Sequence, residues 1–220
     1  MGRFYDQANI PAELRRNYDV YERIRQLGIN LGTFEDNVGS LRGANIASVC
    51  FTEAGLVYLS GIGTGQLPMI EEESIIRHGQ EAGREAADFH IRTLHWALVC
   101  GKEGGDLNDV LYTVKALGMV VSPGGGTFGR APQVVNGYSA RWQSVFGGPI
   151  GEFAVDGIDP GGFSGVHARS ALGGFDGRFS QEPEIIVAIP QALAQAIIAH
   201  RGWLFPLPPA MLEKVRRLWT

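Results

Sequence analysis

The sequence predicts an α/β (α+β) domain in which a mixed β-sheet is backed by two long helices on one face. Short β-rich runs alternate with long helical patterns along the 220 residues. Helices of this length between strands imply crossover connections, which place the helices against a face of the sheet. Apolar residues make up 45% of the chain and charged residues 19%, which is ordinary for a folded globular protein.

The N-terminal part of the chain is expected to contain a helix from Pro11 to Leu27, ended by Gly28. Its apolar residues recur at intervals of three or four: Leu14, Tyr18, Tyr21 and Ile24. We assign residues 1–45 to an N-terminal helical extension that packs on the central domain.

The central domain is expected to begin with two strands, at residues 47–51 and 55–61, around a turn at 52–54. A long helix from Ser74 to Cys100 follows, with one apolar stripe. The stripe contains Ala87, Ile91, Leu94 and Leu98. These patterns predict a hairpin followed by the first of the two long helices.

The middle of the chain predicts a strand over residues 109–122 and a second long helix over 132–146. The apolar face of that helix consists of Val134, Val135, Tyr138, Trp142 and Val145. Residues 147–165 are rich in glycine and are expected to form a loop that is long for a compact domain.

The last part of the central domain is expected to contain strands at 166–174 and 183–189. The element order is then ββαβαββ within residues 46–190. A helix at 190–200, a proline-rich link and a tail helix at 209–219 form a C-terminal extension, residues 191–220.

Composition disfavours several classes of protein. The net charge is −4, and the most basic cluster is only Lys214, Arg216 and Arg217, so nucleic acid is not the expected partner. No run approaches ~18 apolar residues, and no signal core precedes the domain, so we expect a cytoplasmic protein without membrane contact. Cys50 and Cys100 have no metal-type spacing, and no other cluster has ligand spacing, so no metal is expected.

Four stretches in the core resemble the RidA/YjgF family of reactive-intermediate (enamine/imine) deaminases, also called endoribonuclease L-PSP. They are GLVYLSG (55–61), GDLNDVLYTVKALGMVVS (105–122), VVNGYSARWQSVFGG (134–148), and HARSALG (167–173) with PEIIVAI (183–189). YERIRQLGINLG (21–32) resembles the branch of that family with a longer N-terminus. The resemblance implies a RidA/chorismate-mutase-like fold and a homotrimer with pockets at the subunit boundaries.

The resemblance also implies roles for individual residues. Arg169 matches the arginine that pairs with a substrate carboxylate, and a planar guanidinium suits that partner. Glu184 matches the glutamate proposed to activate water. Asn136 matches a pocket asparagine, and Ser60 and Gly61 match a pair whose backbone lines the pocket.

Each of these residues could also have a purely structural role. Arg169 and Glu184 could pair for structure alone, although desolvation makes such a pair a poor stabiliser. Glu184 could be a surface carboxylate on an edge strand. Asn136 could be an amide on a helix face bonded to nearby backbone.

Two positions depart from the family pattern. Leu41 stands where the family usually has a tyrosine, and Ala171 stands where a cysteine is common.

The loop at 148–167 is longer than the family connection and could act as a lid over a bulkier substrate. His167, two residues before Arg169, is a further candidate for substrate binding or proton transfer.

The expected function is hydrolysis of a carboxylate-bearing enamine or imine to a carbonyl compound and ammonia, with no cofactor. Glu184 and Arg169 are the expected catalytic pair. One alternative is another C–N hydrolase or lyase reaction on a larger carboxylated substrate in the same pocket. Others are a non-catalytic trimer that binds carboxylated ligands, and RNA cleavage, which the acidic charge disfavours.

Overall fold

The computed structural model describes residue 12 and residues 15–33, 49–59, 64–68, 72–99, 105–121, 131–147, 152–158 and 178–201. The helices in these ranges are α1 (Val20–Gln26), α3 (Glu72–Val99), the 3-10 turn η3 (Leu107–Asp109), α4 (Ala131–Phe146) and α6 (Gln191–Arg201). The strands are β1 (Val49–Phe51), β2 (Leu56–Leu59), β3 (Thr64–Pro68), β4 (Tyr112–Val121), β5 (Glu152–Ile158) and β6 (Arg178–Ala188).

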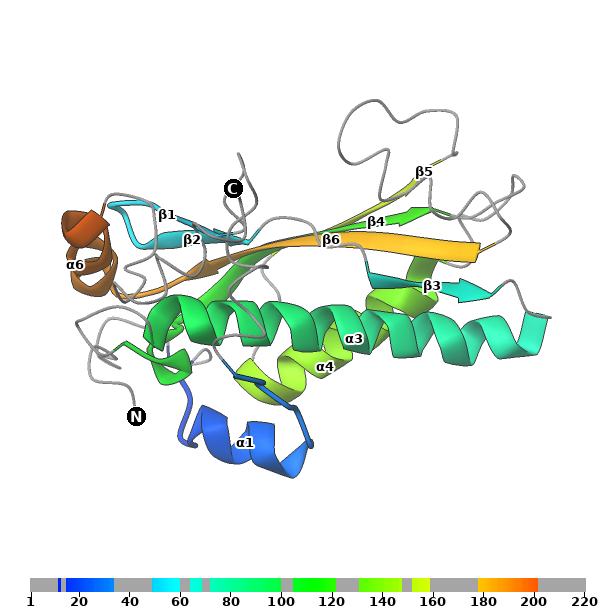
Figure 1. The fold of residues 1–220 in the computed structure, drawn as a ribbon, viewed down its shortest axis with the longest axis horizontal. Helices are drawn as coiled ribbons and strands as arrows, with labels where there is room; N and C mark the ends of the chain where they lie inside the picture. The colour runs from blue at the N-terminus through cyan, green and yellow to red at the C-terminus, as the bar shows by residue number, and fades with distance from the viewer. Residues whose placement is uncertain are drawn as a thin grey trace, which may run out of the picture.

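The strands form one six-stranded mixed sheet with β6 near its centre. The strand order is β1-β2-β6-β4-β5, and β3 pairs with β6 beyond the end of β2. β4 and β5 run parallel, while the other described pairs are antiparallel. Figure 1 shows α3 and α4 together on one face of the sheet, as the sequence predicts, with α1 on the far side of these helices.

The core lies between the helix pair and the sheet. Every residue of the predicted α3 stripe is buried, and so are Tyr138, Trp142 and Val145 of α4. On β6 the alternate residues Ile185 and Val187 are buried against this layer. Leu193, Ala194 and Ile197 extend the core from α6, so the predicted helix at 190–200 packs on the domain.

The N-terminal helix is shorter than the sequence predicts. Residues 15–19 are not helical, and α1 begins only at Val20. Asp19 has extended backbone, and its side chain accepts hydrogen bonds from the N–H groups of Tyr21 and Glu22. The expected start at Pro11 is therefore wrong, because an aspartate N-cap sets the first turn.

Two strands occur where the sequence analysis expected none. The glycine-rich stretch 147–165 was expected to be a loop, but it contains β5, which pairs with β4 from Lys115–Glu152 to Val121–Ile158. β3 follows β2, and its described pairing is with β6. Both depend on long-range pairing, which local composition does not report. The expected strand at 166–174 and tail helix at 209–219 lie outside the described residues.

Residues 15–33 form a strap that packs across the helix layer. The buried Arg16 guanidinium donates hydrogen bonds to the carbonyl oxygens of Asn108, Val110 and Phe146. The Tyr18 hydroxyl donates to the Val145 carbonyl at 3.1 Å, and the Val20 N–H donates to Asn108 Oδ1 at 2.8 Å. The strap thus ties the C-terminus of α4 to the segment that begins β4.

Candidate functional site

The site that the sequence predicts is only partly within the described residues. Glu184 and Asn136 lie in described elements. Arg169, His167, Ser60 and Gly61 lie outside them, as do Leu41 and Ala171. The structure therefore defines the strand framework around position 184, and the roles of the other residues stay predictions.

Glu184 lies on β6, an inner strand of the sheet. Its Cα is opposite that of Leu117 on β4. On the other side of β6, the antiparallel pairing with β2 runs from Leu56–Ala188 to Leu59–Ile185. Glu184 is thus the residue next to the last described pair between β2 and β6, and it is not on an edge strand.

The described pairing on one side of β6 stops next to Glu184. β2 pairs with β6 only from Ile185 onward, and β3 pairs with it only up to Gln181. Among the described residues, positions 182–184 therefore have no partner on this side of β6. Pro183, in this stretch, pairs with Gly118 on β4 and has no N–H to donate.

The two faces of the sheet differ along β6. Ile185 and Val187 contribute to the core beneath the helices. One row of paired positions crosses the opposite face, where Cys50 pairs with Tyr58, Tyr58 with Ile186, and Ile186 with Lys115. Tyr58 is 42% exposed, and alternate residues of a strand share a face. Position 184, two residues from Ile186, therefore belongs to this open face.

Asn136 lies on α4, within the helix layer. Its side chain is exposed, while Tyr138, two residues later, is buried against the sheet. The Ser139 hydroxyl donates to the Asn136 carbonyl at 3.4 Å. No described hydrogen bond joins Asn136 to β6 within the part of the chain that the structure covers. Its predicted place in the pocket stays a prediction.

A buried polar pair joins α3 to α4, and the sequence analysis assigned it no role. His90 is fully buried, and its Nδ1 atom lies 2.7 Å from the Tyr138 hydroxyl. Burial raises the pKa of the Tyr138 phenol well above its ordinary value, so the phenol stays neutral. The pair satisfies two polar groups inside the core, and Tyr138 belongs to the core as expected.

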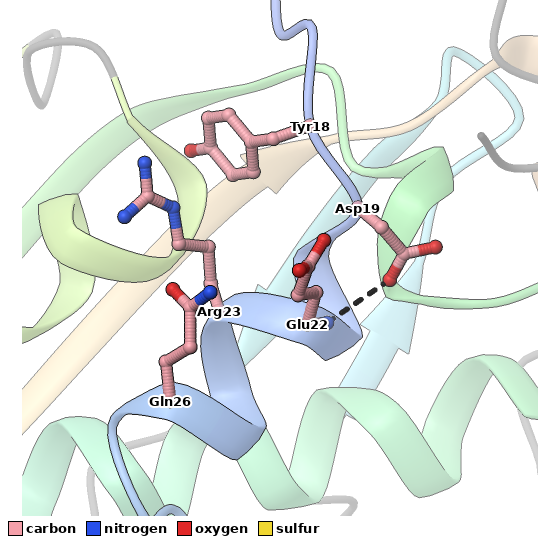
Figure 2. Close-up of a pocket in the computed structure, with 5 residues that line it drawn as sticks. All are labelled: Tyr18, Asp19, Glu22, Arg23 and Gln26. Carbon is pink, nitrogen blue, oxygen red and sulfur yellow. Dashed lines mark hydrogen bonds between the residues drawn. The ribbon is translucent and has the colours of Figure 1, made fainter.

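A small polar hollow lies on α1 and the two residues before it, far along the chain from Glu184. It encloses about 200 Å³ and is lined by Tyr18, Asp19, Glu22, Arg23 and Gln26. Figure 2 shows the Asp19 carboxylate bound to the Glu22 backbone, and the Arg23 guanidinium lies 4.9 Å from the Tyr18 ring centre. Its polar groups thus stabilise the strap, and it contains none of the predicted site residues.

The described ranges give no sign of a metal centre or a membrane span. They contain no group of three or more histidine, cysteine, aspartate or glutamate side chains arranged to hold a metal. Among the described helices, none is both long enough and apolar enough to cross a bilayer.

Comparison with known proteins identifies the fold. No protein-family model and no curated protein matches the sequence. A crystal structure of a protein of unknown function from Agrobacterium tumefaciens is similar, with a TM-score of 0.51 and 18% identity. The similarity covers 78% of this chain and 92% of that one.

A second similar crystal structure is that of a proposed endoribonuclease from Shewanella oneidensis. Its TM-score is 0.52 at 14% identity, and the similarity covers 78% of this chain and 100% of that one. At these identities the similarity concerns the fold alone. The chain thus shares its fold with both structures over 78% of its length.

Proposed function

We propose that this protein is an enamine/imine deaminase of the RidA type that hydrolyses a carboxylate-bearing imine to a carbonyl compound and ammonia. The observation that carries the proposal is the position of Glu184, on an inner strand next to the last described pair between β2 and β6 and on the open face of the sheet. The described parts of the stretches that resemble the family lie in β2, β4, α4 and β6, and the fold shared with the proposed endoribonuclease supports the proposal.

The strand register supports a site that combines distant segments. Leu59 pairs with Ile185, and the residues next along each chain are Ser60 and Glu184. Both residues thus directly adjoin this pair in the sequence, and the resemblance assigns both to the same pocket.

The proposed reaction needs only water and two well-placed side chains. Glu184 accepts a proton from a water molecule whose oxygen bonds to the imine carbon, and the imine nitrogen gains a proton. The resulting carbinolamine loses ammonia as the C–N bond breaks and the carbonyl forms. Arg169 holds the substrate carboxylate through paired hydrogen bonds and so fixes the imine carbon near the water.

The open face of the sheet supports the proposed homotrimer. Tyr58 and Tyr112 are 42% and 37% exposed in the single chain, and they lie on strands at the middle of the sheet. Large exposed side chains on an inner region of a sheet are typical of an interface. Covering this face with further copies would enclose Glu184 at a subunit boundary. We expect Tyr58→Glu to shift the protein toward monomers in sedimentation analysis.

The proposed activity is tested with imines generated in place by an amino-acid oxidase, following release of the keto acid. We expect the wild-type protein to accelerate hydrolysis, and Arg169→Ala to abolish the acceleration while the assembly persists. Arg169→Lys is the matched control, because it keeps the positive charge but loses the planar guanidinium that can form two parallel hydrogen bonds. We expect this variant to retain only part of the activity. Full activity in Arg169→Ala would remove Arg169 from the mechanism.

A well-folded protein without this activity would favour the other reactions of the same pocket. Direct binding of carboxylated ligands, measured by calorimetry with wild type and Arg169→Ala, would then separate a binding protein from an enzyme with a larger substrate. Incubation with RNA tests the remaining alternative, and intact RNA would exclude it.

A further inference from the structure

The strap of residues 15–33 docks on α3 through a hydrogen bond between a tyrosine and a histidine. The Tyr21 hydroxyl lies 2.9 Å from Nδ1 of His95, and the two rings meet edge to face with centres 5.5 Å apart. The Leu107 N–H donates to the Tyr21 oxygen at 3.3 Å. With that oxygen already accepting, the hydroxyl proton is available for a neutral His95 whose Nδ1 is unprotonated.

Neighbouring contacts between the strap and α3 surround this hydrogen bond. The indole N–H of Trp96 donates to the Leu31 carbonyl at 2.8 Å, and the ring of Trp96 lies 4.8 Å from that of His95. Val20 and Ile24 of α1 are buried in the core cluster. His95 is half-buried in the docked state, and detachment of α1 would expose it further to water.

The charged groups around the contact come from three elements. Asp19, just before α1, and Asp106 and Asp109, at η3, act electrostatically on Tyr21. On α3 itself, Arg92 is one turn before His95, and its guanidinium lies over the Phe89 ring at 5.4 Å. At His95 itself, burial disfavours the protonated imidazole and lowers its pKa.

We propose that the strap is an acid-sensitive latch, in which protonation of His95 weakens the docking of α1 on α3. A protonated imidazole cannot accept the Tyr21 hydroxyl proton at Nδ1, and its charge would be buried between α1, η3 and α3. The proposal concerns the strap alone and does not depend on the proposed deaminase activity.

The pH window follows from the sign of the shift. Burial lowers the pKa of docked His95 from 6.5 to about 4. When the strap is detached, the His95 imidazole is hydrated and regains its ordinary pKa. The detached state therefore binds more protons than the docked state between these two pKa values. Docking is therefore strongest above pH 6.5 and weakens as pH falls toward 4. The equilibrium constant for docking of the strap falls by up to about tenfold per pH unit, and by on the order of 10²-fold over the whole range.

Hydrogen–deuterium exchange of the full-length protein measures the latch. Protection of the α1 peptide is followed from about pH 7 to about pH 4.5, corrected for intrinsic exchange, with α4 as the internal reference. We expect α1 protection to fall by up to about tenfold per pH unit below pH 6.5, with a much smaller change in α4. His95→Gln keeps a polar side chain without a titrating group, and we expect its α1 protection to stay level.

Either of two results would overturn the latch. One is α1 protection that stays constant with pH in the wild-type protein, and the other is an unchanged pH dependence in His95→Gln. If His95→Gln does not dock the strap even at neutral pH, NMR titration of His95 in the wild type decides. A midpoint near 4, with opening of α1 over the same range, supports the latch, and a midpoint near 6.5 contradicts it.

Discussion

The indole Nε1 of Trp142 lies 2.7 Å from the hydroxyl oxygen of Thr113, and both residues are buried. This hydrogen bond joins α4 to β4 across the boundary between the helix layer and the sheet. β4 in turn pairs with β6 along the segment that contains Glu184. The contact therefore fixes one side of the framework on which the proposed site depends.

Thr113→Val should destabilise the protein by about 1–3 kcal/mol, because the buried indole N–H loses its acceptor while the shape of the side chain is kept. Denaturant unfolding measures this difference. The double variant Trp142→Phe/Thr113→Val should lose less unfolding free energy than the sum of the two single variants. In the double variant both polar groups are gone, so no buried polar group is left unpaired. Strict additivity would show that the hydrogen bond contributes nothing.

Gly137→Ala should also be destabilising, although alanine normally favours a helix. A Cβ atom at position 137 would lie 2.7 Å from Gln80 Cα and 2.8 Å from Gln80 C on α3. Backbone cannot move aside as a side chain can, so α3 and α4 would have to separate. We expect a loss of about 1–3 kcal/mol in thermal or denaturant unfolding. Ser144→Ala, at an exposed position of α4, is the control, and an equal effect there would contradict the close packing.

Arg16→Met should loosen the strap. The change leaves the carbonyl groups of Asn108, Val110 and Phe146 without the buried guanidinium. A hydrogen bond to a charged group contributes about 1.5–3 kcal/mol to stability. We therefore expect Arg16→Met to lower the free energy of unfolding by an amount of this order. Arg15→Met is the matched control, because Arg15 is exposed. Equal stability of the two variants would mean that the strap is not held through Arg16.

The ion pair between α3 and α4 should contribute less. Arg141 donates from Nε and a terminal nitrogen to the two carboxylate oxygens of Asp88, at 2.6 and 2.9 Å. The side chains are 17% and 27% exposed, so solvent screens the pair. Arg141→Met should cost about 0.5–1 kcal/mol, and this cost should shrink in high salt. A salt-independent loss of several kcal/mol would contradict this account.

The elements that the sequence predicts well are those with a local pattern. The stripe that includes Ile91 and Leu94 predicts α3, and the face that includes Tyr138 and Trp142 predicts α4, because burial on one side repeats with the helix period. The start of α1 was missed, although Asp19 is a typical N-cap residue. β5 was missed because its strand character comes from pairing with β4, within a stretch whose glycines suggest a loop.

The candidate site is harder to predict, because it depends on register. The sequence alone identifies Glu184 through a resemblance, but nothing local shows that it lies on an inner strand between β2 and β4. The hydrogen bond of Tyr21 to His95 likewise joins residues 74 positions apart.

The central claim is that Glu184 acts on water in imine hydrolysis, and the most direct measurement compares Glu184→Gln with Glu182→Gln. Both changes remove one carboxylate from β6, two residues apart, and conserve shape. With an imine generated in place and keto acid release as the readout, we expect Glu184→Gln to lose on the order of 10²-fold or more in the enzyme-dependent rate. Glu182→Gln should stay near wild type. Equal rates in the two variants, with wild-type activity present, would contradict the account.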